Sequence, residues 1–234
     1  MRAYQFTTTS PTLERNLTLN PRAPLPPTAT SLAPSTVLVK VLAASLNAFD
    51  FKLPELRYLG RLAVGRPSVP CMDFAGRVVA LGKETGLEVG DLVYGRLDGP
   101  TKFGTLAEYT VVPRAGCAKL PEGVSVVDGA AAGSVSYCAE IGGIGGGVGK
   151  KIFINGGSGG TGTFGIQIAK AMGCEVVTSC STGNVGLCES LGADVVVDYK
   201  TQDVLAEVKR ISGFDLVVDF VGTPGGCIGR DRRL

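Results

Sequence analysis

Between residues 150 and 222 the chain alternates short apolar strands with helical stretches, and this alternation constrains the fold more than any other feature. The expected strands are KKIFING (150–156), CEVVTSC (174–180), ADVVVDY (193–199) and FDLVVDFVG (214–222). Strands this apolar are buried on both faces, which implies a parallel sheet covered by helices. The strand–helix order predicts right-handed crossovers and a doubly wound α/β sheet.

Three helices are expected between these strands, at 161–173, 183–192 and 201–213. Glycine ends each of them, and Thr201 is the expected N-cap of the third. After Gly222 the sequence TPGGCIGRDRRL is polar and charged and contains no further strand–helix unit. A six-stranded dinucleotide-binding sheet needs two more strands, so we expect this chain to end in mid-fold.

The first half of the chain has a different pattern. Short β-branched runs broken by Pro and Gly predict strands within 36–47, 70–82, 90–95 and 104–113, and no long helix before about residue 125. Five prolines between residues 20 and 36 predict an extended loop. The sequence therefore predicts a mostly β domain over residues 1–125 and an α/β domain over 126–234.

A glycine-rich turn follows the first α/β strand and opens the next helix. Its residues are Gly157, Ser158, Gly159, Gly160, Thr161 and Gly162, which match G-x-G-x-x-G in the required strand–turn–helix context. We expect the first glycine to make the tight turn, the second to admit a pyrophosphate, and the third to pack the helix closely. The free N–H groups of the helix N-terminus would then hold the phosphates.

Two other motifs overlap this region. Residues 156–160 match the G-x-S-x-G of a serine nucleophile, but the chain has no histidine to act as its base, which disfavours a hydrolase. GGIGGGVGKK (142–151) resembles a phosphate-binding loop, but Ile144 replaces a glycine and a strand follows instead of a helix. We interpret that segment as a linker.

The end of the second strand bears on the choice between NAD and NADP. An acidic residue there would bind the ribose 2′-OH of NAD, but VVTSCSTGN offers only the neutral donors Ser181, Thr182 and Asn184. Tyr199 and Lys200 end the third strand nearby. Donors without a carboxylate favour NADP, although NAD stays an alternative and Ser181 or Thr182 can also cap the following helix.

Composition excludes several classes of protein. The 23 Lys and Arg residues nearly balance 21 Asp and Glu residues, so nothing points to nucleic acid or an anionic membrane as partner. Seven scattered cysteines without Cys-x-x-Cys spacing predict free thiols in a reducing compartment. We expect the cytoplasm, with mitochondria as the alternative, because the chain begins with strand-like sequence and not with a secretory signal.

Several motifs in register resemble the medium-chain dehydrogenase/reductase superfamily from Met1 to about Pro224. They are SLNAFDFK (45–52), VPCMDFAGRVVALG (69–82), GDLVYG (90–95), GTLAEYTVVP (104–113), the glycine turn and LGADVVVDYK (191–200). The resemblance implies a GroES-like β domain and an incomplete Rossmann doubly wound parallel sheet that binds NADP. It places the active site in the cleft between them.

Departures from the superfamily indicate the branch. Zinc-dependent members have Cys where this chain has Ala48, and His-Glu where it has Met72-Asp73, and no four-cysteine lobe follows Val93. The resemblance therefore implies no metal site. This leaves the zinc-free quinone oxidoreductases, alkenal/enone reductases and fungal trans-acting enoyl reductases. The sequences DFK (50–52) and CSTGN (180–184) most resemble the last two groups.

The same resemblance suggests catalytic candidates. Asn47 and Asp50 would lie in a loop beside the nicotinamide, Lys52 would neutralise an enolate or anchor a 2′-phosphate, and Ser136 would pack against the nicotinamide; Tyr137 is a weaker proton donor. Each has a structural alternative. Asp50 can simply pin its loop, Lys52 can be a solvated charge, and Ser136 can be a packing residue inside a helix.

The function implied is hydride transfer from NADPH to an activated C=C bond, in an enone or enoyl thioester, or to a quinone. The alternative is a catalytically impaired, shortened paralogue that acts as a nucleotide-binding or interaction protein. We expect the nicotinamide and substrate sites, and the edge through which family members form homodimers, to be incomplete in this chain.

Overall fold

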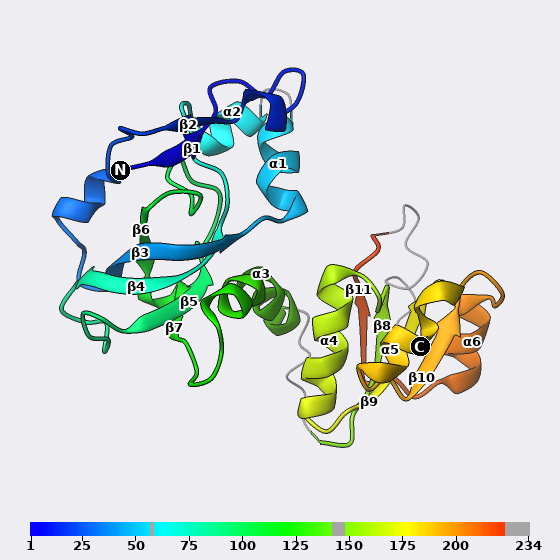
Figure 1. The fold of residues 1–234 in the computed structure, drawn as a ribbon. Coiled ribbons are helices and arrows are strands. Elements are labelled where there is room, and N and C mark those ends of the chain that lie inside the picture. The colour runs from blue at the N-terminus through cyan, green and yellow to red at the C-terminus, as the bar shows by residue number, and fades with distance from the viewer. Residues whose placement is uncertain (57–58, 142–147, 223–234) are drawn as a thin grey trace. The chain divides into compact units, whose positions relative to one another are not determined.

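A computed structural model describes residues 1–56, 59–141 and 148–222, without the side chains of Arg61 and residues 136–141. The chain divides into two compact units, Met1–Ser134 and Val135–Leu234 (Figure 1). The division falls inside helix α3 (Val126–Ile141), which begins at the domain boundary expected from the sequence. No helix in the described part of the chain is long and apolar enough to cross a membrane.

The first unit is built on a five-stranded antiparallel sheet with the order β6-β3-β4-β5-β7. These strands are β3 (Thr36–Ser45), β4 (Asp73–Leu81), β5 (Leu92–Arg96), β6 (Tyr109–Pro113) and β7 (Cys117–Lys119). A separate ribbon pairs β1 (Ala3–Gln5) with β2 (Thr18–Asn20). The expected β-rich first half is confirmed, with each predicted strand region containing a strand.

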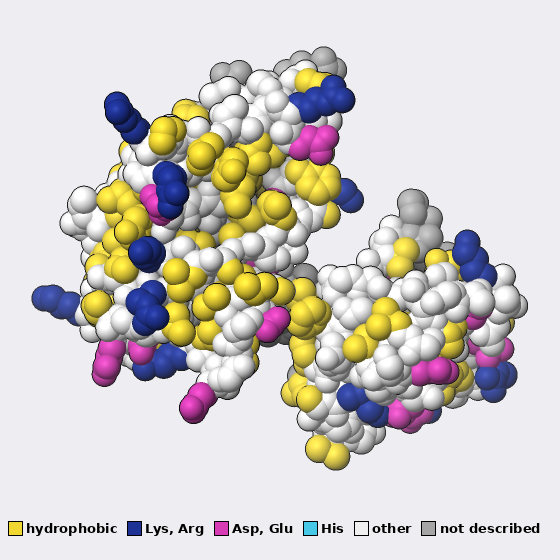
Figure 2. All heavy atoms as spheres, viewed as in Figure 1, with side chains coloured by type: hydrophobic (Ala, Val, Ile, Leu, Met, Phe, Trp, Pro, Cys, Tyr) yellow, Lys and Arg dark blue, Asp and Glu magenta, His cyan; other side chains and the backbone are white. Residues whose placement is uncertain are grey.

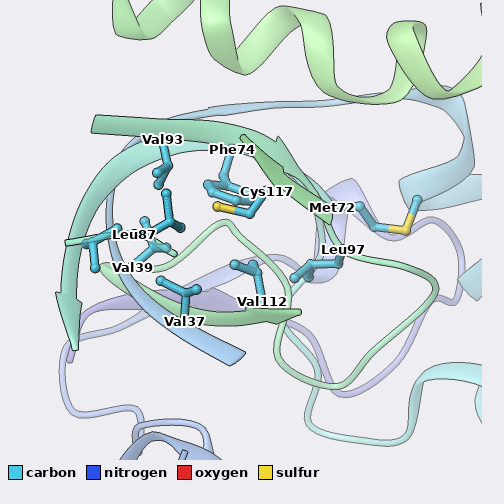
Figure 3. Packing of buried hydrophobic residues seen from close by; sticks show 10 residues of the cluster. Val37, Val39, Met72, Phe74, Leu87, Val93, Leu97, Val112 and Cys117 are labelled. Carbon is cyan, nitrogen blue, oxygen red and sulfur yellow. The ribbon is translucent and has the colours of Figure 1, made fainter. Parts of the chain in front are cut away.

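Alternation of side chains along the strands forms the core of this unit. Val37 and Val39 of β3 are fully buried, and so are Phe74 of β4 and Val112 of β6. Figure 3 shows these side chains pointing toward one another inside the curved sheet. Successive residues of a strand face opposite sides, so Val37, Val39 and the partly buried Val41 of β3 all reach this core.

Two short helices in the first unit were not expected. Helix α1 (Ala48–Glu55) begins directly after Asn47, and α2 (Leu59–Val64) follows it. A short 3-10 helix, Pro27–Thr30, also interrupts the predicted extended loop. Both α-helices are too short to show a clear helical period in the sequence, which explains why the prediction missed them.

The second unit is a parallel sheet with the order β10-β9-β8-β11. Its strands are β8 (Lys151–Asn155), β9 (Glu175–Cys180), β10 (Val195–Asp198) and β11 (Leu216–Asp219). The predicted strand order along the chain and the parallel pairing are confirmed. The order reverses beside β8, because β9 lies on one side of it and β11 on the other.

Helices cover both faces of this sheet, as in a doubly wound fold. Helices α4 (Gly160–Ala171) and α5 (Val185–Ser190) pack on one face through Ile166 and Cys188. Helix α6 (Val204–Ile211) packs on the other through Val208, against Phe153 and Val177. The odd and even residues of each strand thus meet different helices, which requires the near-continuous apolar strands seen in the sequence.

The N-cap of α6 differs from the expected one. Asp203, not Thr201, is the cap, and its carboxylate accepts a hydrogen bond of 3.0 Å from Ala206 N. Thr201 Oγ1 instead donates to Asp198 O at 3.4 Å. Both Thr and Asp cap helices well. Ala206 is the third residue of α6 and its N–H has no partner within the helix, so the carboxylate of Asp203, three residues earlier, accepts it.

Charged side chains are dispersed over both units. In Figure 2 the Lys and Arg side chains lie scattered among Asp and Glu side chains on the visible face of each unit, with no single large basic patch there. Several are paired, for example Lys170 with Asp194 at 2.8 Å.

Candidate functional site

A cavity of about 500 Å³ lies beyond the carboxyl ends of the strands in the second unit. The residues that line it end or follow all four strands: Asn155 at the end of β8 and Gly156 after it, Ser179 and Cys180 in β9, Tyr199 after β10, and Phe220 and Val221 after β11. The glycine turn and the first residues of α4 form another wall. Ligands of open α/β sheets bind at this position, beside the strand where the order reverses.

The glycines of the turn are required by close packing. A Cβ atom at Gly157 would collide with the side chain of Thr178 in β9, and one at Gly162 would collide with Gly156 O. The tight turn itself is made by Gly156, whose φ is +86°. The third glycine of the motif therefore packs the helix closely, as expected, whereas the left-handed residue is Gly156 and not Gly157.

The start of α4 offers free backbone donors. Gly159 is the N-cap and has no side chain to satisfy the first N–H groups of the helix. The N–H groups of Gly160, Thr161 and Gly162 have no partner within the helix, since each would need an acceptor four residues earlier in helical geometry. A Cβ atom added at Gly160 would meet nothing within 4 Å, so the cradle is open and suits an anion such as a diphosphate.

The expected adenosine-side residues lie next to this turn. Asn184 donates from Nδ2 to Ser158 Oγ at 3.3 Å and to Ser181 Oγ at 3.1 Å. Tyr199 is half-exposed on the cavity wall, with Lys200 Nζ 5.4 Å from its ring centroid. The structure thus brings Ser158, Ser181 and Asn184 into one neutral polar cluster at the turn.

One acidic residue near this cluster escaped the sequence argument. Asp198 ends β10 beside the end of β9, where it pairs in register with Cys180. Hydrogen bonds from the Thr182 hydroxyl and from Lys200 N hold the pKa of Asp198 below its usual value. The sequence argument looked for an acid only after β9, but a parallel neighbour strand brings Asp198 to the same edge.

Ser158 has a different neighbour from the one a nucleophile needs. Its hydroxyl lies at hydrogen-bond distance from the amide of Asn184, which donates to it and cannot take its proton. The hydrolase alternative gains no base from this contact. Of the predicted linker 142–151, residues 142–147 lie outside the described part of the chain.

In the first unit, a buried carboxylate organises the loop that contains Asn47. Asp73 is fully buried and accepts hydrogen bonds from Asn47 Nδ2 at 2.9 Å, Ser134 N at 2.9 Å and Ser134 Oγ at 2.7 Å. Asp73 thereby joins the start of α1 to α3. The sequence analysis used Asp73 only as evidence against a zinc site. Asp73 stands in a mainly apolar run and is followed by Phe74, and this position could have identified it as a buried residue.

Asp50 lies one turn into α1 and is also buried. Its Oδ2 accepts the N–H of Asn47 at 2.7 Å, which is the geometry expected of a residue that pins its loop. Burial raises the pKa of Asp50 to about 6, against a smaller opposing effect of the Asn47 N–H. The catalytic role of Asp50 stays a prediction, and so does that of Asn47.

The other two catalytic candidates are less constrained. Lys52 is exposed on α1. Ser136 and Tyr137 lie in α3, but their side chains are outside the described part of the chain. The structure therefore brings Asn47 and Asp50 together and leaves the roles of Lys52 and Ser136 as predictions.

Beside this loop lies a second cavity of about 390 Å³. Its apolar lining residues are Leu13, Leu17, Leu46, Ala48, Phe51 and Pro70. Its polar lining residues are Glu14, Asn47, Asp50 and Glu55. Apolar walls with a few polar groups are the usual surroundings of a small organic ligand.

Cysteine and carboxylate side chains do not form a metal centre in the described residues, where no group of three or more His, Cys, Asp or Glu side chains could hold an ion. Cys71 is buried near Asp50 and Asp73, and its Sγ donates to Ser45 O at 3.0 Å. Burial raises the pKa of the Cys71 thiol to about 12, so it stays a protonated thiol at neutral pH. The expectation of a metal-free site remains a prediction.

Comparison with known proteins identifies the family. Residues 33–122 match the alcohol dehydrogenase GroES-like domain, and residues 160–226 match the zinc-binding dehydrogenase family. The chain belongs to the medium-chain dehydrogenase/reductase superfamily. Its first unit corresponds to the GroES-like part of that superfamily, and its second contains the parallel sheet with the glycine turn.

Individual relatives in this superfamily are reductases by name. The chain is 58% identical over 233 residues to the trans-enoyl reductase pgmF of Aspergillus terreus, covering 96% of this chain and 65% of that protein. It is 40% identical over 199 residues to the 2-methylene-furan-3-one reductase of Solanum lycopersicum, covering 80% of this chain and 50% of that protein. The chain thus spans less than two thirds of the length of these relatives.

A solved structure agrees with the fold. The quinone oxidoreductase of Coxiella burnetii superposes with a TM-score of 0.76 at 27% identity, covering 95% of this chain and 69% of that one. The expected resemblance to enoyl, enone and quinone reductases is confirmed by these names. The substrates in the names are those of the relatives, and independence from zinc stays a prediction for this chain.

Proposed function

We propose that the protein to which this chain belongs is a zinc-independent oxidoreductase that transfers hydride from NADPH to an activated C=C bond or a quinone. The observation that carries the proposal is the cavity at the reversal point of the parallel sheet, bounded by a close-packed glycine turn and by the open N-terminus of α4. Relatives named as enoyl, furanone and quinone reductases support the reaction class.

In this proposal the backbone N–H groups of Gly160, Thr161 and Gly162 hold the cofactor diphosphate, together with the start of the α4 dipole. Gly157, Ser158 and Gly159 form the turn that leads into them. Ser181, Asn184 and Tyr199, with Lys200, surround the adenosine ribose. The neutral donors and the Lys200 ammonium group support the 2′-phosphate of NADP over the 2′-OH of NAD, whereas the Asp198 carboxylate at this edge opposes it. Because Asp198 is already engaged by the Thr182 hydroxyl and by Lys200 N, we assign the site to NADP.

When bound, a reduced nicotinamide supplies a hydride, which adds to the β-carbon of the activated C=C bond. The π electrons of that bond would move toward the carbonyl oxygen, and a proton from solvent water would complete the reduction at the α-carbon. Hydrogen-bond donors or cations must stabilise the negative oxygen where no metal does so. We assign this task to Asn47 and Lys52, with Ser136 against the nicotinamide and Asp50 holding the loop.

Asn47 is suited to a positioning task because its orientation is fixed. One of its amide hydrogens is committed to Asp73, and its N–H is held by Asp50. A side chain whose rotamer is fixed by buried partners loses little entropy when it meets a substrate. The apolar cavity beside Asn47 suits the hydrocarbon part of an enone or enoyl thioester.

Two measurements test the proposal. Fluorescence titration of this chain should show NADPH binding more tightly than NADH. In the whole protein to which the chain belongs, NADPH oxidation should depend on an added enone, enoyl thioester or quinone. The variant Gly159→Val keeps an ordinary extended backbone at the N-cap (φ −75°, ψ 164°) but fills the cradle, so it should fold and lose NADPH.

The outcomes separate two functions. NADPH binding without turnover in the whole protein would favour the alternative of a nucleotide-binding or interaction protein. Unchanged NADPH affinity in Gly159→Val would overturn the assignment of the glycine turn. Equal affinity for NADH and NADPH would overturn the NADP preference and leave the fold assignment intact.

A further inference from the structure

A row of three polar side chains crosses the carboxyl end of the sheet in the second unit. Asp219 of β11, Asn155 of β8 and Ser179 of β9 are register partners on adjacent strands. Asn155 Nδ2 donates to Asp219 Oδ1 at 2.9 Å, and Ser179 Oγ donates to Asn155 Oδ1 at 2.6 Å. These are the last paired residues of β8 and β11, directly before the cavity.

Ser179 connects this row to the glycine turn. Gly156 N donates to Ser179 Oγ at 3.1 Å, and Gly157 N donates to Ser179 O at 2.9 Å. Ser179 is buried, with 1% of its surface exposed. One residue of β9 therefore fixes two consecutive N–H groups of the turn, including that of the left-handed Gly156.

The hydrogen bonds of the row run in one direction. Each member donates toward Asp219, from Gly156 N through Ser179 and Asn155 to the carboxylate. A carboxylate only accepts, so it selects the orientation of the Asn155 amide that leaves Asn155 Oδ1 facing Ser179. Hydrogen bonds in such a chain polarise and strengthen one another.

The carboxylate also holds the opposite wall of the cavity. Asp219 Oδ1 accepts Val221 N at 2.9 Å and Gly222 N at 3.3 Å. Val221 lies against the turn so closely that a Cβ atom at Gly156 would be 2.8 Å from its Cγ2. Burial opposes ionisation of Asp219, but the hydrogen bonds from Val221, Asn155 and Gly222 outweigh it and lower its pKa.

We propose that Ser179, Asn155 and Asp219 form the positioning unit of the glycine turn, with Ser179 as its central residue. They fix Gly156 and Gly157 so that the N–H groups at the start of α4 face the cofactor diphosphate. None of the three is a catalytic residue. The inference rests on the proposed function for the identity of the ligand, but the effect on the turn itself can be measured without any ligand.

The first test compares Ser179→Ala and Asn155→Ala with the unchanged chain. Without these hydrogen bonds of the positioning unit, the turn samples other conformations. NADPH should then bind about tenfold more weakly, which corresponds to about 1.4 kcal/mol of binding free energy. Adenosine 2′-phosphate lacks the diphosphate and should bind with unchanged affinity. Both substitutions break the same link, so the double variant should lose little more NADPH affinity than either single variant.

Asp194→Asn is the matched control. Asp194 holds the opposite end of the same strand β9, where its Oδ2 accepts Val176 N at 2.7 Å. This variant should lose some stability and keep its affinity for NADPH. A loss of NADPH affinity in Asp194→Asn equal to that in Ser179→Ala would overturn the inference, because general loosening of the sheet would then explain both.

Amide hydrogen exchange, followed by mass spectrometry without ligand, decides the inference independently of the proposed function. Residues 155–160 should exchange about tenfold faster in Ser179→Ala, while residues 193–198 should exchange at the unchanged rate. Unaltered exchange at 155–160 would overturn the inference. Failure of the unchanged chain to bind NADPH would instead overturn the proposed function, and the exchange result would still stand for the turn.

Discussion

Asp73 shows how a single buried carboxylate can hold a loop in place. It accepts three hydrogen bonds from Asn47 and Ser134, and all three donors lose their partner if the carboxylate is removed. A buried donor without an acceptor costs about 1–3 kcal/mol. The effect of Asp73 on the protein is therefore expected to be much larger than that of a surface acid.

We predict that Asp73→Ala lowers the free energy of unfolding by about 3 kcal/mol or more, measured by urea denaturation. Asp128 is the control, since it is exposed and shares a hydrogen bond of 2.7 Å with Ser125. Asp128→Ala should change the unfolding free energy by about 0.5–1 kcal/mol. Equal effects in the two variants would contradict the anchoring role of Asp73.

Asp50 should make stability depend on pH. Its pKa is raised from 3.8 to about 6 in the folded chain, mainly by burial. As pH rises, the Asp50 carboxyl ionises at a lower pH in the unfolded chain than in the folded chain. Its contribution to the free energy of unfolding is therefore fully present below about pH 4 and is lost as pH rises through 6. The full difference between the two pKa values corresponds to about 3 kcal/mol.

We therefore predict that Asp50→Asn gains stability relative to the unchanged chain as pH rises from 4 to 7.5. Asn keeps one oxygen that can accept the N–H of Asn47, so the loop contact persists. Urea denaturation at both pH values measures the difference. A gap between the two proteins that stays constant across this range would show that Asp50 does not titrate with a raised pKa.

At the scale of elements, the sequence located the helices and strands of the second unit well and their ends less well. Glycine marks the ends of α4, α5 and α6 by its special backbone freedom, and Gly173, Gly192 and Gly213 all have positive φ. The start of α6 was misplaced by two residues, because Thr201 and Asp203 are both good caps and only the position of Ala206 N decides between them.

The glycine turn allows a matched test within one element. We predict that Gly157→Ala lowers the free energy of unfolding by about 2 kcal/mol, because its methyl group overlaps Thr178. Gly160→Ala meets nothing within 4 Å and should leave stability unchanged or raise it by up to about 1 kcal/mol, since Ala favours a helix over Gly. Thermal denaturation compares the two, and equal loss in both would contradict the packing described for Gly157.

At the scale of the whole molecule, each unit has its own hydrophobic core. Val37, Val39, Phe74 and Val112 belong to one core, and the core clusters of the second unit lie on the two faces of its sheet. A ligand held by the second unit should therefore stabilise that unit directly.

We predict that NADPH at about 100 times its dissociation constant stabilises the second unit by about 2.7 kcal/mol. Amides of β8 and β9 that exchange only on unfolding should then exchange about 100-fold more slowly. Gly159→Val should show no such protection. Protection of the same size in that variant would mean that NADPH binds elsewhere on the chain.

The sequence alone determined the fold class, because period and polarity are local properties. Apolar strands separated by helices can be buried only in a covered parallel sheet, and the strand–glycine–helix order predicts the phosphate-binding turn without knowledge of any distant contact. The resemblance to a reductase superfamily rests on motifs of the same local kind.

Only the tertiary structure decided which distant residues meet. Asp198 reaches Thr182, Ser179 reaches Gly156, and Asp73 reaches Asn47 and Ser134, although long stretches of chain separate most of these pairs. Strand register and helix packing create such contacts, and both depend on how whole elements bury their surfaces. A sequence pattern describes one element at a time, so it names candidate residues but not the partners that hold them.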